Sequence, residues 1–463
     1  MFTHPTPTRQ VFPLDPDLAG KIVRAGDERF DQARSSWNLA ADQRPAAVVF
    51  PETAEDVRAA VRLAADCGLR IAAQGTGHLA APLGDLSDTI LLKTGRMRGI
   101  RIDPAARIAR AEAGVVWLEV VEAAARHGLA ALAGSSPDVG VVGYTLGGGL
   151  SFLGRKYGLA ASNVDAIELV TAGGQLVRAD RRHEPDLFWA MRGGGGSFGI
   201  VTAIEFRLFP VSRMYAGHLW YPIERGPDVL HAWAELTHRE IPDELTTVGR
   251  YWRFPALPDI PEEVRGQSFV TVEAYHLGEP GQADELLAPL RTLGPVKDTI
   301  QIVPVPVVSH LHMDPEHPVP YTGDGMLLTD LPGAAVDAFV QVSGSTAGNS
   351  LLSVEIRHLG GELARPRPGN GALSSIDARY VLHAIGMAPD PGSTAAVTAQ
   401  TGSVKRALAP WAASQMYLNF AETDSPIAPL WTEHAYQRLR RIKAAVDPAN
   451  LIRANHPVTP AAR

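Results

Sequence analysis

Residues 134–149 read GSSPDVGVVGYTLGGG, and this glycine-rich stretch says more about the fold than any other part of the chain. Two shorter glycine clusters lie before and after it, at 75–78 and 193–199. Glycine lets the main chain approach a ligand closely and present its N–H groups without an intervening side chain. A single cluster could be a tight turn between short strands. Three clusters, one of which contains His78, favour a cradle for a dinucleotide-type cofactor.

Gly194, Gly196 and Gly199 match the GxGxxG spacing of the Rossmann fingerprint. That fingerprint lies after a strand and before a helix, because the helix N-terminus receives the pyrophosphate. Here residues 185–191 are typical of a helix, and residues 200–208 alternate apolar and polar side chains like a strand. A Walker phosphate loop is excluded as well, since the chain has no Gly-Lys-Ser/Thr sequence. The glycines therefore predict neither of these two folds.

The composition is that of a globular protein. A length of 463 residues predicts two or three domains, and 45% hydrophobic residues are enough for a large core. The single cysteine, Cys67, excludes an intramolecular disulfide and any cysteine-based metal site. A net charge of −7 argues against a nucleic-acid partner. The sequence has no apolar run of 18 residues and no signal-like N-terminal segment, so we expect a cytoplasmic location and no membrane span.

Strand and helix patterns alternate from residue 46 to residue 208. Thr53 and Asp56 predict a helix start in the manner of a capping box. After Pro210 the glycine clusters thin out, and longer amphipathic stretches appear. We therefore predict an α+β protein with three segments: 1–209, 210–414 and 415–463, of which the last returns to the first domain.

The glycine clusters resemble those of a known family. Residues 74–78 (QGTGH), 139–149 (VGVVGYTLGGG) and 186–202 (DLFWAMRGGGGSFGIVT) are similar to the cofactor loops of berberine-bridge-enzyme-like flavoproteins of the vanillyl-alcohol-oxidase superfamily. Residues 417–420 (YLNF) and 447–451 (DPANL) resemble two C-terminal elements of that family. The resemblance covers about 45–210 and 415–457. It implies an FAD-binding domain of two subdomains with an inserted α+β substrate domain.

The resemblance also implies how FAD is held. The loop histidine of the family bonds to the flavin 8α-methyl, and by position this is His78. Many members have a second tether through a cysteine, where this chain has Ser136; we therefore expect a single covalent link. The alternative is that His78 only contacts the flavin, and Gln74, where the family usually has arginine, bears on this choice. The residues expected to contact FAD are Gln74, Gly75, Thr76, Gly77, His78, Ser136, Pro137, Val139, Gly140, Gly143, Gly147, Gly148, Gly199, Val201 and Asn419.

Three side chains are candidates for catalysis. Tyr417 holds the family position of a base, with a purely structural tyrosine as the alternative. In residues 351–357, alternation places Glu355 and Arg357 on one face of a strand, which could face either the substrate or solvent. Tyr144 stands where the family often has histidine and could shape the substrate or oxygen pocket. A metal site in the histidine-rich loop that contains His310, His312 and His317 is disfavoured because no matched acidic spacing accompanies it.

The predicted function is that of an FAD-dependent oxidase or oxygenase of secondary metabolism. The single-tether pattern is similar to that of polyketide flavoenzymes, which use molecular oxygen on a poly-β-carbonyl substrate and trigger a Favorskii-type rearrangement. Such a substrate could be presented by an acyl carrier protein, and a homodimer is compatible with the sequence. The alternatives are a sugar or alcohol oxidase that releases hydrogen peroxide and a non-catalytic flavin-binding module.

Overall fold

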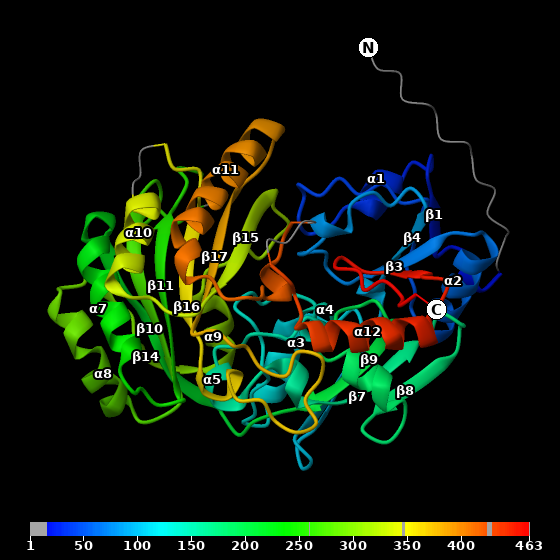
Figure 1. Cartoon of the computed structure of the whole chain (residues 1–463), viewed down its shortest axis with the longest axis horizontal. Coiled ribbons are helices and arrows are strands. Elements are labelled where there is room, and N and C mark those ends of the chain that lie inside the picture. Colours follow the sequence, from blue (N-terminus) through cyan, green and yellow to red (C-terminus); the bar gives the residue numbers. More distant parts are fainter. Residues whose placement is uncertain (1–15, 259, 345–347, 424–427, 463) are drawn as a thin grey trace.

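The computed structural model describes residues 16–258, 260–344, 348–423 and 428–462. Within these ranges the strands form three sheets, and helices cover their outer faces (Figure 1). Two of the sheets are built mainly from the first 207 residues, and the third lies beside them. This mixed helix-and-sheet architecture confirms the predicted fold class.

The first sheet has a parallel centre and is completed by the C-terminal end of the chain. Its strand order is β1 (Ile22–Arg24), β2 (Ala47–Val49), β4 (Thr89–Lys93), β3 (Arg70–Gln74) and β18 (Ile452–Arg453). Helix α2 (Ala54–Asp66) packs on it, and the predicted capping box is present: the Thr53 side chain accepts from the Asp56 amide, and the Asp56 side chain accepts from the Thr53 amide. Short helix α1 (Phe30–Arg34) borders β1 and β2.

The second sheet is antiparallel and carries the second and third glycine loops. Its order is β5 (Ile100–Asp103), β6 (Ile108–Glu112), β9 (Ile200–Arg207), β7 (Val164–Val170) and β8 (Leu176–Asp180). The helices of this part are α3 (Trp117–Ala125), α4 (Val141–Leu146), α5 (Gly154–Tyr157), α6 (Pro185–Ala190) and α12 (Glu433–Val446). The third glycine loop follows helix α6 and precedes strand β9. The argument against a Rossmann turn is therefore confirmed.

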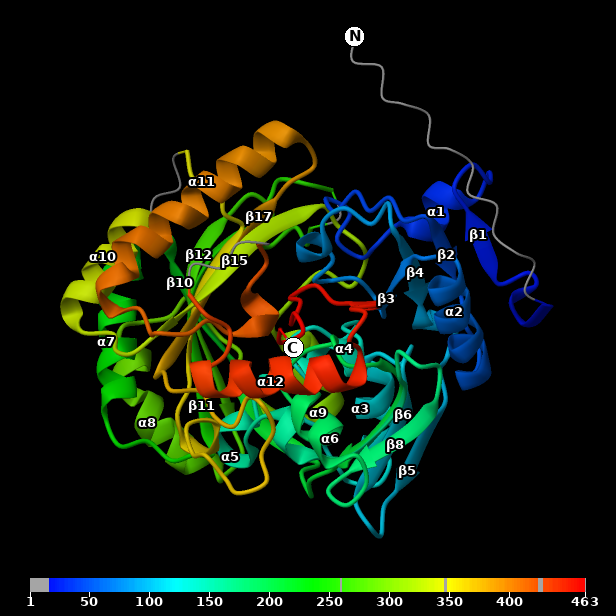
Figure 2. The same cartoon turned by 45° about the vertical axis from the view of Figure 1, so that its right-hand side comes forward.

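The third sheet forms the body of the other half of the molecule. Its order is β13 (Lys297–Asp298), β10 (Arg213–Pro222), β12 (Ser268–His276), β11 (Leu245–Arg253), β16 (Ser353–His358), β17 (Tyr380–Met387) and β15 (Tyr321–Leu328), with β14 (Gln301–Pro304) also paired to β10. One face is covered by α7 (Gly226–His238), α8 (Pro280–Thr292), α10 (Gly333–Ser343) and α11 (Pro391–Leu408) (Figure 2). Helix α9 (Val305–Leu311) packs against α3 of the other half.

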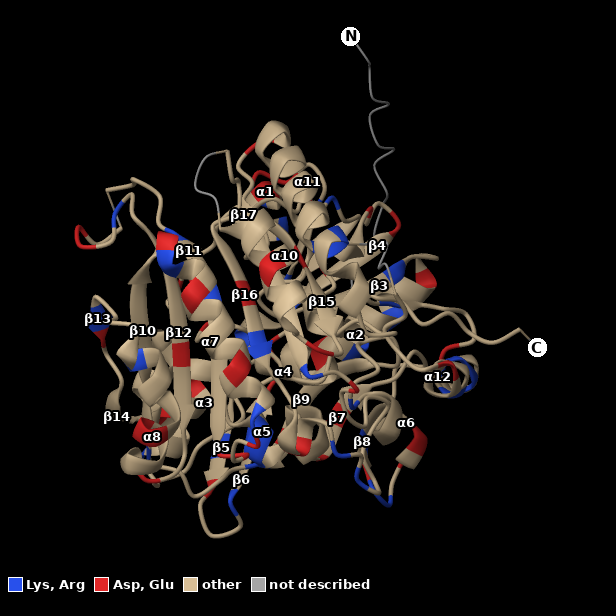
Figure 3. Cartoon of the chain, turned by 60° about the vertical axis from the view of Figure 1, so that its left-hand side comes forward, with Lys and Arg blue, Asp and Glu red and all other residues tan. Residues whose placement is uncertain are grey.

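Charged residues interrupt strands β12 and β16 of this third sheet (Figure 3). Glu273 and Glu355, one in each of these strands, are fully or almost fully buried. Because a buried charge is costly unless it is paired, these positions mark a site rather than a core. The sheet memberships support the predicted division at 209/210 and 414/415, which stays a prediction. In the described ranges, no helix combines the length and apolar character needed to cross a membrane.

Candidate active site

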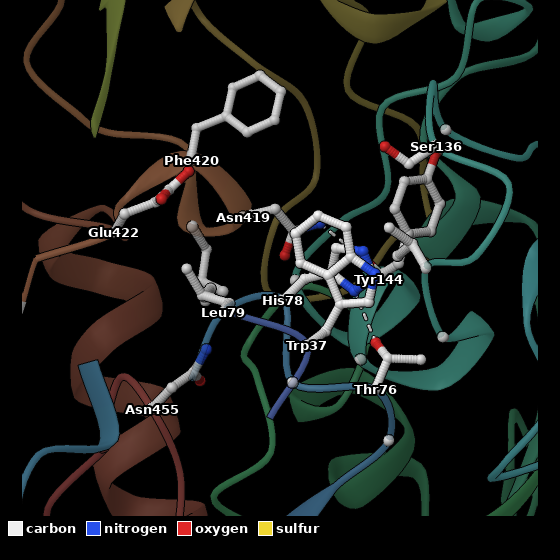
Figure 4. A pocket seen from close by; sticks show the side chains of 18 of the residues that line it. Trp37, Thr76, His78, Leu79, Ser136, Tyr144, Asn419, Phe420, Glu422 and Asn455 are labelled. Atoms are coloured by element: carbon white, nitrogen blue, oxygen red, sulfur yellow. Dashed lines mark hydrogen bonds between the residues drawn. The ribbon is translucent and has the colours of Figure 1, made fainter. Parts of the chain in front are cut away.

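A deep cavity lies between the two halves of the molecule. The three glycine loops, the segment at 417–422 and strands β16 and β17 of the third sheet line it. Figure 4 shows Ser136 and Tyr144 on one side of this space, Phe420 and Glu422 on the opposite side, and Trp37 and His78 between them. The fold thus brings the three glycine clusters of the sequence together around this cavity.

The glycines of these loops differ in what surrounds them. A methyl group on Gly147 or Gly199 would collide with Asn419 or Leu169, so these two glycines serve packing. Four others border the cavity with no protein atom closer than 3.8 Å to an added Cβ: Gly75, Gly140, Gly143 and Gly196. Such bare main chain around a cavity fits an elongated ligand held by backbone contacts. The residues present therefore fit a dinucleotide such as FAD.

His78 contacts four neighbours in the cavity wall. Its Nδ1 lies 2.8 Å from the Thr76 hydroxyl, and its Nε2 lies 3.3 Å from Asp138 Oδ1. The Trp37 ring stacks on the imidazole at 4.0 Å, and its indole N–H donates to Asp138. From the third sheet, the Tyr321 hydroxyl donates to the His78 carbonyl at 2.9 Å. His78 is consequently held rigidly from both halves of the molecule.

The position expected for a second tether is occupied by a hydrogen bond between the two halves. The Ser136 hydroxyl donates to Asp314 Oδ2 at 2.5 Å. The adjacent Ser135 hydroxyl accepts from Arg357 at 3.3 Å. Both serines of the second glycine loop are therefore bound to side chains of the half that contains the third sheet.

Of the two candidate tyrosines, Tyr417 is buried and Tyr144 is half-buried. Burial raises the pKa of Tyr417 above its ordinary value, although Asn419 and the amides of Gly149 and Leu150 favour the phenolate. Asn419 Nδ2 donates to the Tyr417 oxygen at 3.1 Å. Burial likewise raises the pKa of Tyr144 well above its usual range, and the Tyr144 hydroxyl donates to the Leu132 carbonyl at 3.0 Å. Both tyrosines are therefore neutral phenols near neutral pH.

Glu355 is the centre of a buried ionic cluster. It is 2% exposed, so the alternative of a solvated sheet face is wrong. Arg357 Nε donates to its Oε1 at 2.8 Å, and His312 Nε2 lies 3.1 Å from its Oε2. Burial alone would raise the pKa of Glu355, but Arg357 and His312 outweigh it and hold the pKa well below the ordinary value. Glu355 is an ionised carboxylate at the cavity wall, and within the described residues its Oε2 accepts no well-aligned hydrogen bond.

The histidine-rich loop is divided by the fold. His310 is exposed and pairs with Glu316 at 2.5 Å, whereas His312 points inward between Glu273 and Glu355. These last three residues bring ligand atoms within 4.8 Å of one another. Two guanidinium groups already neutralise the carboxylates, since Arg250 lies 3.3 Å from Glu273 and Arg357 binds Glu355. The arrangement is an ion-pair network more than a cation cage.

Most residues predicted from the sequence line the cavity. These are Glu355, Tyr417, Tyr144, Gln74, Gly75, Thr76, Gly77, His78, Ser136, Val139, Gly140, Gly143, Gly147, Gly199, Val201 and Asn419. Pro137 and Gly148 lie behind the wall: the Pro137 carbonyl accepts from the Leu118 amide, and Gly148 packs close to Leu373 and Tyr417.

Several cavity residues were not predicted, among them Trp37, Arg250, Asp314, Tyr321, His383 and Glu422. His383 could have been found, because it is a polar residue within the apolar run at 380–387. The others come from segments without a local pattern and meet only in the folded chain.

Comparison with known proteins agrees with this geometry. Residues 45–180 match the family described as FAD binding domain, and residues 416–459 match the family described as berberine and berberine like. Over 461 residues the chain is 31% identical to the (R)-6-hydroxynicotine oxidase of Paenarthrobacter nicotinovorans. The alignment covers 96% of this chain and 97% of that protein.

Two solved structures have the same overall fold. The crystal structure of 6-hydroxy-D-nicotine oxidase from Arthrobacter nicotinovorans superposes with a TM-score of 0.79 at 28% identity, over 95% of this chain and 98% of the other. The berberine bridge enzyme of Eschscholzia californica superposes with a TM-score of 0.80 at 19% identity, over 97% and 99%, and this likeness shows the fold alone.

Proposed function

Because the chain belongs to the berberine-bridge-enzyme-like family of FAD-linked oxidoreductases, we propose that it is an oxidase that carries FAD covalently on His78. When bound, FAD accepts a hydride from a substrate C–H bond and passes the electrons to molecular oxygen. The observation that carries the proposal is the set of bare glycines around a cavity whose wall holds an immobilised imidazole. With Ser136 at the other tether position, the link is single.

The chain's own groups would bind and orient the substrate. Glu355 offers a buried, ionised carboxylate oxygen that can accept from a hydroxyl or amine of the substrate. Such an acceptor fixes the neighbouring C–H bond, and positioning of this kind supplies a large part of catalysis. The sequence predicted Tyr417 as a base, but burial raises the pKa of its phenol, and we propose instead that Tyr417 donates a hydrogen bond to the substrate. The predicted role of Tyr144 in shaping the cavity remains a proposal.

Two substrate classes follow from different observations. A poly-β-carbonyl chain, which the enzyme would oxidise with oxygen and thereby rearrange, is supported by Arg250 and Arg357, because guanidinium groups stabilise an enolate oxygen. A hydroxylated cyclic amine is supported by the Glu355 carboxylate and by the 31% identical hydroxynicotine oxidase.

The covalent link is tested on a denaturing gel. The wild-type band should fluoresce under ultraviolet light after acid treatment, and His78→Ala should abolish the fluorescence. His183→Ala, which changes an exposed histidine outside the cavity, is the matched control and should keep it. A fluorescent His78→Ala band would contradict the assignment, and a protein without flavin absorbance would contradict the whole proposal.

The activity is tested with a panel of (R)-6-hydroxynicotine, a synthetic tricarbonyl thioester and simple sugars. Bleaching of the flavin absorbance without oxygen identifies the substrate class. Hydrogen peroxide equal to the oxygen consumed indicates an oxidase, and a deficit indicates an oxygenase. Absence of reduction by every compound would favour a flavin-binding module.

A further inference from the structure

His383 is a cavity residue whose surroundings resemble those of a catalytic base. It lies on β17, directly opposite Glu355 of β16 in the sheet register. Its Nε2 is 2.7 Å from Glu422 Oε1, and the Phe420 ring stacks on the imidazole at 4.3 Å and 11°. A base within a cavity, oriented by a carboxylate, is the arrangement that proton-abstracting sites require.

The pKa values of the other candidate bases, Glu355 and Tyr417, do not suit proton abstraction near neutral pH. A general base works best when its pKa is near the working pH. The pKa of the Glu355 carboxyl is held low against burial by Arg357 and His312, so Glu355 binds a proton weakly. Burial raises the pKa of the Tyr417 phenol, so Tyr417 keeps its proton. Neither group changes its protonation readily near neutrality.

His312, a buried histidine that also lines the cavity, is already fully engaged. His312 Nδ1 lies 2.8 Å from Glu273, and its Nε2 lies between Glu355 and Arg250. In the described part of the chain, by contrast, the hydrogen bonds of His383 involve Nε2 alone. Its Nδ1 lies 3.9 Å from Glu355 Oε1, too far for a hydrogen bond. The lone pair of Nδ1 can therefore receive a proton from a molecule in the cavity.

We propose that His383 is the base that takes the proton from the substrate hydroxyl or amine, and that Glu422 orients its ring. In this step the heteroatom–H bond breaks and its proton moves to His383 Nδ1. The hydride leaves the neighbouring carbon for FAD, and a carbon–heteroatom double bond forms. The substrate thus loses two electrons and two hydrogens. The inference rests on the proposed function, because it assigns a group to that same oxidation.

Charged and polar groups from several elements face His383. Glu422 contacts it from the C-terminal segment, and Glu355 faces it from β16. From β15, Tyr321 interacts with Glu422, and Asp324 is neutralised by Lys405 of α11. Arg357 is the nearby cation, with its guanidinium carbon 5.3 Å from the centre of the Phe420 ring that stacks on the imidazole. His383 is therefore flanked by the carboxylates of Glu422 and Glu355.

The test follows flavin reduction in rapid-mixing experiments without oxygen between pH 5.5 and 9. The probe is (R)-6-hydroxynicotine or whichever panel compound reduces the wild-type flavin. His383→Gln should lower the limiting reduction rate about 10²–10⁴-fold, the usual contribution of a general base. It should also remove the acid limb of the pH profile. His231→Gln changes an exposed histidine on α7 and is the control, expected to match the wild type.

Glu422→Gln gives a second readout with His383 in place. Loss of the carboxylate destabilises the imidazolium, so the acid limb should move to lower pH, and the limiting rate should fall by less than in His383→Gln. Flavin content of both variants is checked by absorbance before mixing. A His383→Gln protein that keeps the acid limb and reduces within threefold of the wild type would overturn the inference while the proposed function stands. A wild type that no probe reduces would instead remove the proposed function.

Discussion

Replacing Lys443 should loosen the third glycine loop from the C-terminal segment. Lys443 lies on α12 with no exposed surface, and its ammonium donates three hydrogen bonds: to the Ser197 carbonyl at 2.7 Å, to Asp447 Oδ2 at 2.6 Å and to the Ile452 carbonyl at 2.9 Å. Methionine has a similar length and no charge. The Lys443→Met substitution therefore removes these bonds without opening a large cavity.

The expected loss in the free energy of unfolding depends on the hydrogen bonds that Asp447 keeps in the variant. Breaking a buried ion pair by removing one partner costs about 3–5 kcal/mol, because the other charge is left uncompensated. Asp447 keeps the amides of Leu451 and Ile452 as donors, both at 2.8 Å, which places the cost in the lower part of that range. We expect a loss of about 3–4 kcal/mol in the free energy of unfolding.

Urea unfolding of the flavin-loaded protein, followed by flavin and tryptophan fluorescence, measures this loss. The slope of the transition should stay constant, so that the change appears in the midpoint. Arg44→Met is the control, because the side chains of Arg44 and Asp42 are 74% and 56% exposed. An exposed pair contributes about 0–1 kcal/mol. Equal destabilisation of the two variants, each below about 1 kcal/mol, would refute the reasoning.

Two further predictions concern the cavity. Gly143→Leu should lower the amount of bound FAD at least tenfold, because the added side chain enters the cavity between the glycine loops. Gly281→Leu on exposed α8 is the control and should leave the flavin content unchanged. Equal flavin absorbance in both proteins would contradict the role of these loops as a cofactor cradle. The second prediction concerns stability at low pH. His312 and the neighbouring guanidinium groups outweigh the effect of burial, so the pKa values of Glu355 and Asp314 lie below the ordinary values. The unfolded chain then binds more protons at acid pH, so the free energy of unfolding should fall as the pH drops below about 4.3. A urea midpoint that is the same at pH 6 and pH 4 would contradict this.

Local patterns predicted much of the cofactor-binding half. The capping box at Thr53 and Asp56 specified the start of α2, and the glycine clusters specified loops that line the cavity. Both signals are short-range: a cap satisfies backbone donors within one turn, and a glycine acts at its own position. The sequence also predicted the polar face of β16, because strand alternation is a local rule as well.

The substrate-side chemistry was predicted less well, for a physical reason. Glu273, His312 and Glu355 come from β12, the segment after α9 and β16, and only sheet pairing brings them together. No residue spacing along the sequence predicts contacts between such distant segments. His383 is a lone polar residue in a buried strand, and the partner that gives it a role, Glu422, lies on the C-terminal segment.

The pairing of β18 with β3 has a consequence for how the protein is made. Ile452 and Arg453 add the last strand to a sheet that otherwise forms from the first hundred residues, and Ala454 and Asn455 complete the cavity wall. A chain still being translated lacks that strand and that wall. We therefore expect cofactor loading to follow translation of residues 452–455, because a nascent or prematurely terminated chain has an open sheet edge at β3.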